Sequence, residues 1–142
     1  MSNNDKRGSI KYPDRYKQLI DFSGLQRMRK ITPTDIDGFI DYGGNAFVII
    51  EGKHESKDID YGQRLCMENI VKAFKKAKKI AIAFIFKHSK NSDEIIYASE
   101  QRVYEYYATF TSGWENVFEK DYTVLDIINR FENYCKEQNI EL

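Results

Sequence analysis

The chain has 142 residues with 22 basic and 22 acidic side chains, and 42% of its residues are hydrophobic. This composition suits one folded domain and excludes a disordered chain. No apolar run approaches the ~20 residues that span a membrane, and the first residues lack the apolar core of a secretory signal. The two cysteines are far apart and no Cys/His cluster has zinc spacing, so we expect a cytoplasmic protein with reduced thiols.

The balanced total charge is unevenly distributed along the chain. Residues 1–90 carry 18 basic and 11 acidic side chains, whereas residues 91–142 carry 4 and 11. Within the first part, residues 31–60 are acidic, with 7 acidic and 2 basic side chains, and the flanking segments are basic. An acidic segment between basic ones is the layout expected of a metal site that receives a polyanion.

Hydrophobic periodicity and turn residues predict the elements of the chain. Runs of Ile, Val and Phe indicate strands, and the apolar run at residues 80–88 is typical of an inner strand buried on both faces. In chain order we predict a helix at 13–22, strands at 26–31, 34–42 and 46–54, a helix at 61–78, a strand at 80–88, two strands or a strand and a helix over 94–99 and 102–111, and a helix at 124–138.

The two strands at 34–42 and 46–54 form a hairpin that brings charged side chains together. If the hairpin closes about its two glycines, facing residues have numbers that sum to about 87–88. Asp37 then lies opposite Glu51, and Asp35 opposite Lys53. Buried carboxylates require a cation between them, and oxygen ligands alone suit Mg²⁺ or Mn²⁺. The alternative interpretation is a pair of solvent-facing carboxylates on an edge hairpin.

The helix at 61–78, capped by Asp58 or Asp60, has a glutamine at the start of its apolar stripe. This residue, Gln63, either points along the buried face toward Asp37 and Glu51 or simply occupies the partly wet end of a helix. The opposite side of the helix is a solvated basic face that can also bind a nucleic-acid backbone. Its lysines include Lys72, Lys75 and Lys76.

The element order and the motif resemble the PD-(D/E)XK nuclease superfamily, which has the restriction-endonuclease-like fold. Asp37 is followed after thirteen residues by Glu51-Gly52-Lys53, an E-x-K that closes an apolar strand. Gln63 is similar to the glutamine found in the Holliday-junction-resolvase-like and RecB-like branches. The resemblance implies one α/β domain over residues 1–142 with a mixed central sheet flanked by helices. Its α-β-β-β-α-β core would cover about residues 13–88, followed by strand and helix additions over 89–142.

The sequence departs from the family pattern at two points. The literal proline–aspartate pair is absent, because Pro33 precedes Asp35 by two residues, and Asp35 therefore rivals Asp37 as the first ligand. Many relatives also place a glutamate on the first helix, but the first 50 residues contain none. Asp14 and Asp21 are the only carboxylates on the predicted first helix.

The resemblance implies a Mg²⁺- or Mn²⁺-dependent DNA endonuclease that cleaves branched or structured DNA as a homodimer. Asp37, Glu51 and the backbone carbonyl of Gly52 would bind the metal. Lys53 would hold the attacking water or stabilise the transition state, and Gln63 would orient the water or a phosphate. Basic side chains would bind the DNA backbone, namely Arg27, Arg29, Lys72, Lys75 and Lys76.

Two other functions remain open from the sequence. The neutral total charge and the missing glutamate also suit a catalytically inactive nuclease fold that binds nucleic acid or a protein partner. A nuclease for RNA or single strands is the other possibility, with Tyr104, Tyr106 and Tyr107 as a stacking platform.

Overall fold

The computed structural model describes residue 12 and residues 18–142. The chain divides into two compact units, Met1–Pro33 and Thr34–Leu142. None of the helices that the structure describes is both long and apolar enough to cross a membrane. The single domain with a core at about 13–88 stays a prediction.

The described part of the N-terminal unit contains two single turns of 3-10 helix, η1 (Ser23–Leu25) and η2 (Met28–Lys30). The strand predicted at 26–31 is therefore wrong. Arg29 and Lys30 have φ angles of 60° and 61°, in the left-handed region that interrupts an extended chain.

The helix predicted at 13–22 also has no helical counterpart among the described residues. Residues 13–17 lie outside them, and residues 18–22 adopt no helical conformation. Leu19 is 96% exposed, so this segment buries no apolar face. Short helices are marginal without such packing, which is the physical reason for the difference.

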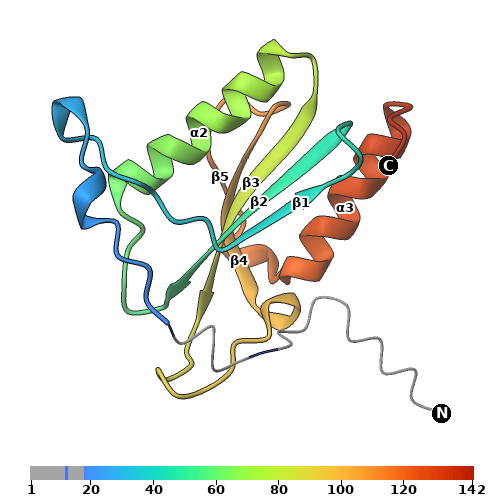
Figure 1. Ribbon diagram of the computed structural model, residues 1–142. Helices are drawn as coiled ribbons and strands as arrows, with labels where there is room; N and C mark the ends of the chain where they lie inside the picture. The colour runs from blue at the N-terminus through green and yellow to red at the C-terminus, as the bar shows by residue number, and fades with distance from the viewer. Residues whose placement is uncertain (1–11, 13–17) are drawn as a thin grey trace. The chain divides into compact units, whose positions relative to one another are not determined.

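The C-terminal unit contains a five-stranded sheet with its strands in chain order. β2 and β3 run parallel and are connected through α2, whereas every other neighbouring pair is antiparallel (Figure 1). The predicted α/β class, with a mixed sheet flanked by helices, is confirmed. The elements are β1 (Gly38–Asp41), β2 (Ala46–His54), α2 (Tyr61–Lys76), β3 (Ile80–His88), η3 (Ala98–Glu100), β4 (Arg102–Ala108), β5 (Glu115–Asn116), η4 (Phe118–Lys120) and α3 (Val124–Glu137).

The α-β-β-β-α-β order is not confirmed, because the described residues contain no strand at 26–31 and their sheet begins at the hairpin β1–β2. The segment after β3 forms one of its two predicted strands. A turn at residues 92–94 and an irregular segment at 95–97 lead into η3, whereas β4 pairs antiparallel with β3. Strand propensity alone left this segment ambiguous. Propensity describes how well side chains suit a half-buried sheet surface, but it does not say whether a partner strand is present.

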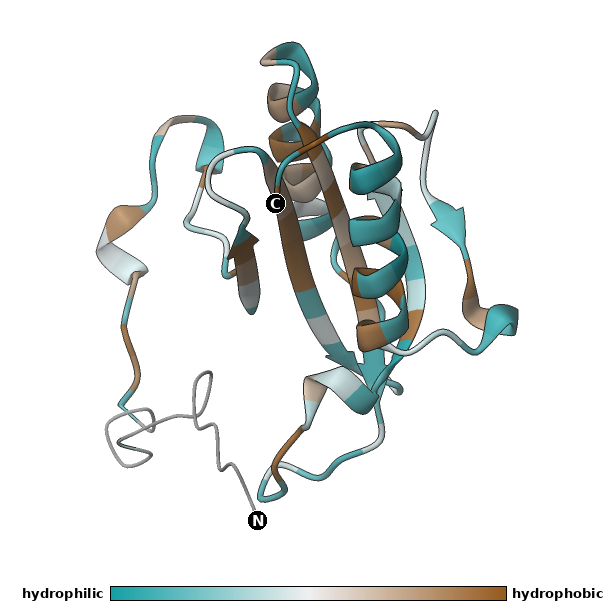
Figure 2. Cartoon of the chain, turned by 90° about the vertical axis from the view of Figure 1, so that its right-hand side faces the viewer, coloured by the Kyte–Doolittle hydropathy of each residue, from teal (hydrophilic) through white to brown (hydrophobic). Residues whose placement is uncertain are grey.

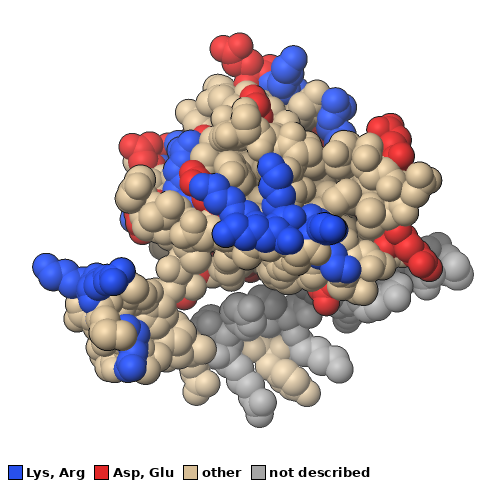
Figure 3. Space-filling view, turned by 90° about the horizontal axis from the view of Figure 1, so that it is seen from above, with Lys and Arg blue, Asp and Glu red and all other residues tan. Residues whose placement is uncertain are grey.

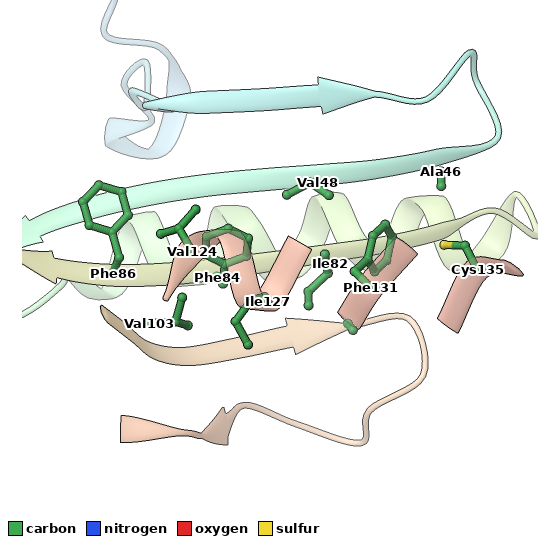
Figure 4. Close-up of a cluster of buried hydrophobic side chains, with 11 residues drawn as sticks. Ala46, Val48, Ile82, Phe84, Phe86, Val103, Val124, Ile127, Phe131 and Cys135 are labelled. Carbon is green, nitrogen blue, oxygen red and sulfur yellow. The ribbon is translucent and has the colours of Figure 1, made fainter. Parts of the chain in front are cut away.

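The sheet is buried on both faces by helices. On one face α3 covers a cluster that includes Val48, Ile82, Phe84 and Phe131 (Figure 4). On the other face α2 covers a second cluster that includes Ile49, Met67, Val71, Ala83 and Ile85. Burial of each large side chain contributes about 1.5–3 kcal/mol, so these two clusters hold β2 and β3 rigidly.

The two central strands change character along their length. Figure 2 shows them hydrophobic for most of their course and hydrophilic toward their carboxyl ends. β2 ends in Lys53-His54 and β3 ends in Lys87-His88, and the two dipeptides are register partners. The polar residues at the ends of β2 and β3 are therefore held in place by the rigid, apolar part of the sheet.

The hairpin turn forms as predicted. Gly43 and Gly44 have φ angles of 61° and 82°, and the Asn45 amide donates to the Tyr42 carbonyl at 3.1 Å. Two consecutive positive φ angles match a type I′ turn, which suits the twist of antiparallel strands. This turn sets the register of the strands that carry the candidate site.

Candidate functional site

The hairpin register places Asp37 beside Glu51. Gly38 pairs with Ile50 in the first rung of β1–β2, so Asp37, which directly precedes β1, continues the ladder opposite Glu51. Its Oδ2 accepts a hydrogen bond from the Gly52 amide at 2.8 Å. This carboxylate therefore takes the place of a strand partner at the end of β1.

The rival first ligand, Asp35, lies two residues farther from the hairpin. It is exposed, and within the described part of the chain no hydrogen bond or ion pair is found for it. Asp37 is therefore the first carboxylate of the site by geometry.

Glu51 is the centre of the arrangement and is only 4% exposed. Lys53 lies two residues along the same strand face, with its Nζ 3.7 Å from Glu51 Oε1. Gln63 comes from α2, and its Nε2 donates to the same Oε1 at 3.1 Å. Asp60 caps this helix by accepting from the amides of Gly62 and Gln63, so Gln63 is held in the first turn. Of the two interpretations that the sequence allowed for Gln63, the structure supports the one in which its side chain points toward Glu51.

Burial, and after it the negative charge of Asp37, raise the pKa of Glu51 to about 7. The ammonium of Lys53 and the hydrogen bond from Gln63 oppose this rise. Without a cation, the folded protein therefore favours the protonated carboxyl up to neutral pH. A bound cation would favour the carboxylate instead.

The raised pKa of Glu51 predicts a pH-dependent stability in the metal-free protein. Between pH 4.5, the ordinary pKa of a glutamate, and about 7, the folded state keeps a proton on Glu51 that the unfolded state has lost. The stabilisation is complete below pH 4.5 and is lost as the pH rises through 7. We expect the loss of unfolding free energy with rising pH to be about 2 kcal/mol smaller in Glu51→Gln than in the wild type.

Urea unfolding of the wild type and of Glu51→Gln, at pH 5 and at pH 8 in EDTA, measures this effect. The quantity compared is the change in unfolding free energy between the two pH values. Glu137→Gln, at an exposed position of α3, is the matched control and should keep the wild-type pH dependence. The same pH dependence in Glu51→Gln as in the wild type would contradict the burial cost assigned to this carboxyl.

Gly52 supplies backbone groups to the site. Its amide points to Asp37, and in an extended strand the amide and carbonyl of one residue face the same side. The carbonyl oxygen of Gly52 therefore faces the edge that holds Asp37. A side chain here is excluded, because a Cβ would lie 2.3 Å from Cζ of Phe86.

The oxygen atoms at this edge fit a hard divalent cation. They are the carboxylates of Asp37 and Glu51, the Gly52 carbonyl, and Oε1 of Gln63, which is fully buried and has no hydrogen-bond partner. Among the described residues no group of three or more His, Cys, Asp or Glu side chains could hold a metal. Two carboxylates are nevertheless sufficient for Mg²⁺, which keeps several waters and commonly binds one or two carboxylates with substrate phosphates.

The structure does not bring the predicted DNA-binding residues to this site. Lys72, Lys75 and Lys76 are exposed near the end of α2, about 14–20 Å along the helix from Gln63 at 1.5 Å per residue. Figure 3 looks onto the end where α2 terminates, and lysine and arginine side chains gather there. They can contact only a distant part of a long ligand.

The two predicted arginines, Arg27 and Arg29, are exposed in the N-terminal unit. Asp21, one possible first-helix ligand, accepts from the Ser23 amide at 2.8 Å, and this bond holds its pKa below the usual value. Asp14 lies outside the described residues. Within the unit Thr34–Leu142, no third acidic side chain forms a metal-holding group with Asp37 and Glu51.

Some polar residues near the site were missed by sequence reasoning. Arg64 pairs with Glu105 at 2.8 Å and lies over the ring of Trp114 at 4.7 Å, next to Gln63 on α2. No sequence signal links positions 64 and 105, because their contact depends on the register of β4. Lys87 could have been found, since Lys-His ends both apolar strands of a parallel pair.

Comparison of the chain with family models, with characterised proteins and with solved structures finds no match. The fold defines the class as mixed α/β, and the site's chemistry rests on the geometry of its own residues.

Proposed function

We propose that this protein is a Mg²⁺- or Mn²⁺-dependent DNA endonuclease of the PD-(D/E)XK kind. The carrying observation is that one buried carboxylate, Glu51, lies within 3.7 Å of Lys53 Nζ and 3.1 Å of Gln63 Nε2. Asp37 lies beside it through the Gly52 amide. A buried acid between a cation, an amide and a second acid is costly for folding, so a chemical role is the best explanation.

Each residue has a distinct role in phosphodiester hydrolysis. Asp37, Glu51 and the Gly52 carbonyl hold the cation. When bound, a divalent cation lowers the pKa of its water and neutralises charge on the phosphate. Lys53 donates hydrogen bonds to a phosphate oxygen as negative charge builds in the transition state. The free Oε1 of Gln63 accepts a hydrogen bond from the attacking water and orients it.

The wider features of the proposal rest on the resemblance of the motif. We propose cleavage of branched or structured DNA by a homodimer, with a 5′-phosphate left on the product. Lys72, Lys75 and Lys76 then contact the DNA backbone at a distance from the cleavage point, which makes binding sensitive to salt.

A second candidate is a nuclease fold that binds nucleic acid or a protein partner without cleavage. Its support is that only two carboxylates, Asp37 and Glu51, lie at the site among the described residues. This candidate predicts no measurable Mg²⁺ binding by calorimetry.

The test compares wild type with Glu51→Ala on branched, duplex and single-stranded DNA and on RNA, with Mg²⁺, Mn²⁺ or EDTA. We expect cleavage by the wild type only with a divalent cation, and loss of both cleavage and the metal isotherm in Glu51→Ala. Glu137→Ala, prepared in the same way, controls for contaminating nuclease and should cleave normally. Cleavage by Glu51→Ala at the wild-type level, or no cleavage of any substrate by the wild type, would contradict the proposal.

A further inference from the structure

Three cationic side chains form a row at the end of the sheet where β2 and β3 terminate. Lys53 on β2 is the register partner of Lys87 on β3, and Lys87 is the partner of Arg102 on β4. Register partners share one face of a sheet, and neighbouring strands lie about 4.8 Å apart. This cation row begins at the lysine of the proposed active site and leads away from it.

Pairing between the strands does not by itself account for the cation row. Like charges directly opposite each other are destabilising. The carboxylates near its outer members are Asp58, 3.9 Å from Lys87 Nζ, and Asp121, 2.9 Å from Arg102 Nη2. Both carboxylates are exposed, and exposed ion pairs contribute little. A chain of phosphates along the row would satisfy all three cations together.

Aromatic rings alternate with the outer cations. A shift in the β3–β4 register makes Tyr104 the extra residue of a bulge. Lys87 Nζ lies 4.2 Å from the centroid of this ring, and the Phe118 ring lies 4.9 Å from it. Arg102 Cζ in turn lies 3.9 Å from the Phe118 centroid, and its guanidinium also donates to the Phe118 carbonyl. Cations and π faces in alternation suit a nucleic-acid strand.

A hollow of about 490 Å³ lies beside these rings. Tyr104 and Phe118 line it together with two cations of the row, Lys87 and Arg102, and two carboxylates, Glu55 and Glu100. The charges of these four side chains balance, so the interior of the hollow suits a neutral group with a π face. A nucleobase has this chemistry, and its phosphates would remain on the cation row.

We propose that the cation row and this hollow bind an unpaired DNA strand, with phosphates along the row and one base against Tyr104. Duplex DNA can place phosphates on the row, but its stacked bases cannot enter the hollow. The inference deepens the proposed function and rests on it for one point, the substrate class: DNA in which an unpaired strand leaves the cleavage point.

The test is fluorescence anisotropy with labelled oligodeoxythymidine and a duplex of equal length, in EDTA so that no cleavage occurs. We expect Tyr104→Leu to weaken binding of the single strand about tenfold and of the duplex less than about twofold, because only an unpaired base stacks. Tyr104→Phe keeps the ring and should bind the single strand as the wild type does. Duplex binding that Tyr104→Leu retains shows that this variant is folded.

The charge arm of the test uses Lys87→Ala. This change should weaken binding of both DNAs. It should also reduce the slope of log Kd against log salt concentration by about the amount expected for one phosphate contact. Lys136→Ala, an exposed position of α3, is the matched control and should bind normally. Equal loss of single strand and duplex in Tyr104→Leu, or no loss in either variant, overturns the proposal. Tighter binding of oligouridine than of oligodeoxythymidine overturns the choice of DNA.

Separate measurements of binding in EDTA and of cleavage with Mg²⁺, both on the wild type and on Tyr104→Leu, separate this proposal from the proposed function. If the wild type binds as expected and cleaves nothing, the proposed function fails and the strand site stands. If the wild type cleaves DNA but Tyr104→Leu binds the single strand normally, the strand site fails and the proposed function stands.

Discussion

Replacing Lys53 with methionine is expected to lower kcat for Mg²⁺-dependent DNA cleavage about 10²–10³-fold, the usual loss when one donor to a developing negative charge is removed. Methionine keeps the length and packing of the side chain but removes the ammonium beside Glu51. The pKa of that carboxyl then rises further above 7, since Lys53 normally lowers it. Single-turnover rates should therefore be measured at pH 8.5 with saturating Mg²⁺, where the carboxylate is formed.

Lys53→Arg is the conservative control, because it keeps the positive charge while changing its geometry. We expect it to retain DNA binding and to recover part of the rate. If saturating DNA restores the full rate of Lys53→Met, then Lys53 acts only in binding and its assigned role in the transition state is wrong. A thermal melt of each variant excludes unfolding as the cause.

Replacing Gly52 with alanine is expected to destabilise the protein by about 3 kcal/mol, at the upper end of the cost of overpacking a core. The added Cβ would lie 2.3 Å, 2.7 Å and 2.9 Å from three atoms of the Phe86 ring. Phe86 is 5% exposed and is enclosed by the cluster under α3, so the ring cannot move freely. Guanidinium unfolding of the purified variant measures the change.

Gly113→Ala is the matched control for this substitution, because no atom lies within 4 Å of the Cβ it would add. It should change stability by less than about 0.5 kcal/mol. The double variant Gly52→Ala with Phe86→Leu should be less destabilised than the two single changes add up to, since the smaller side chain relieves the clash. Strict additivity would show that the contact with Phe86 is not the cause.

Local pattern was sufficient to predict the hairpin and the pairing within it. The turn at Gly43 and Gly44, the bounds of β2, and the position of Asp37 opposite Glu51 all follow from period-two alternation and from glycine's access to positive φ. The start of α2 was equally local, because Asp60 caps the helix through amides two and three residues later. Short-range geometry determines each of these features.

The same local reasoning failed before the hairpin. The apolar residues at 26–31 alternate as in a strand, but in the described part of the chain no strand pairs with them, and Arg29 and Lys30 turn the chain. A strand exists only where another strand completes its hydrogen bonds, and no single segment carries that information.

The sequence by itself determined the hairpin, the carboxylates and lysine that it carries, and the glutamine that follows it. Only the tertiary structure decided that Glu51 is buried, that Gly52 lies under Phe86, and that Lys53 starts a row continued by Lys87 and Arg102. The reason is physical: burial, close approach and cross-strand register arise from contacts between residues far apart in the chain. These contacts set the pKa of Glu51 and bring the three cations of the row together.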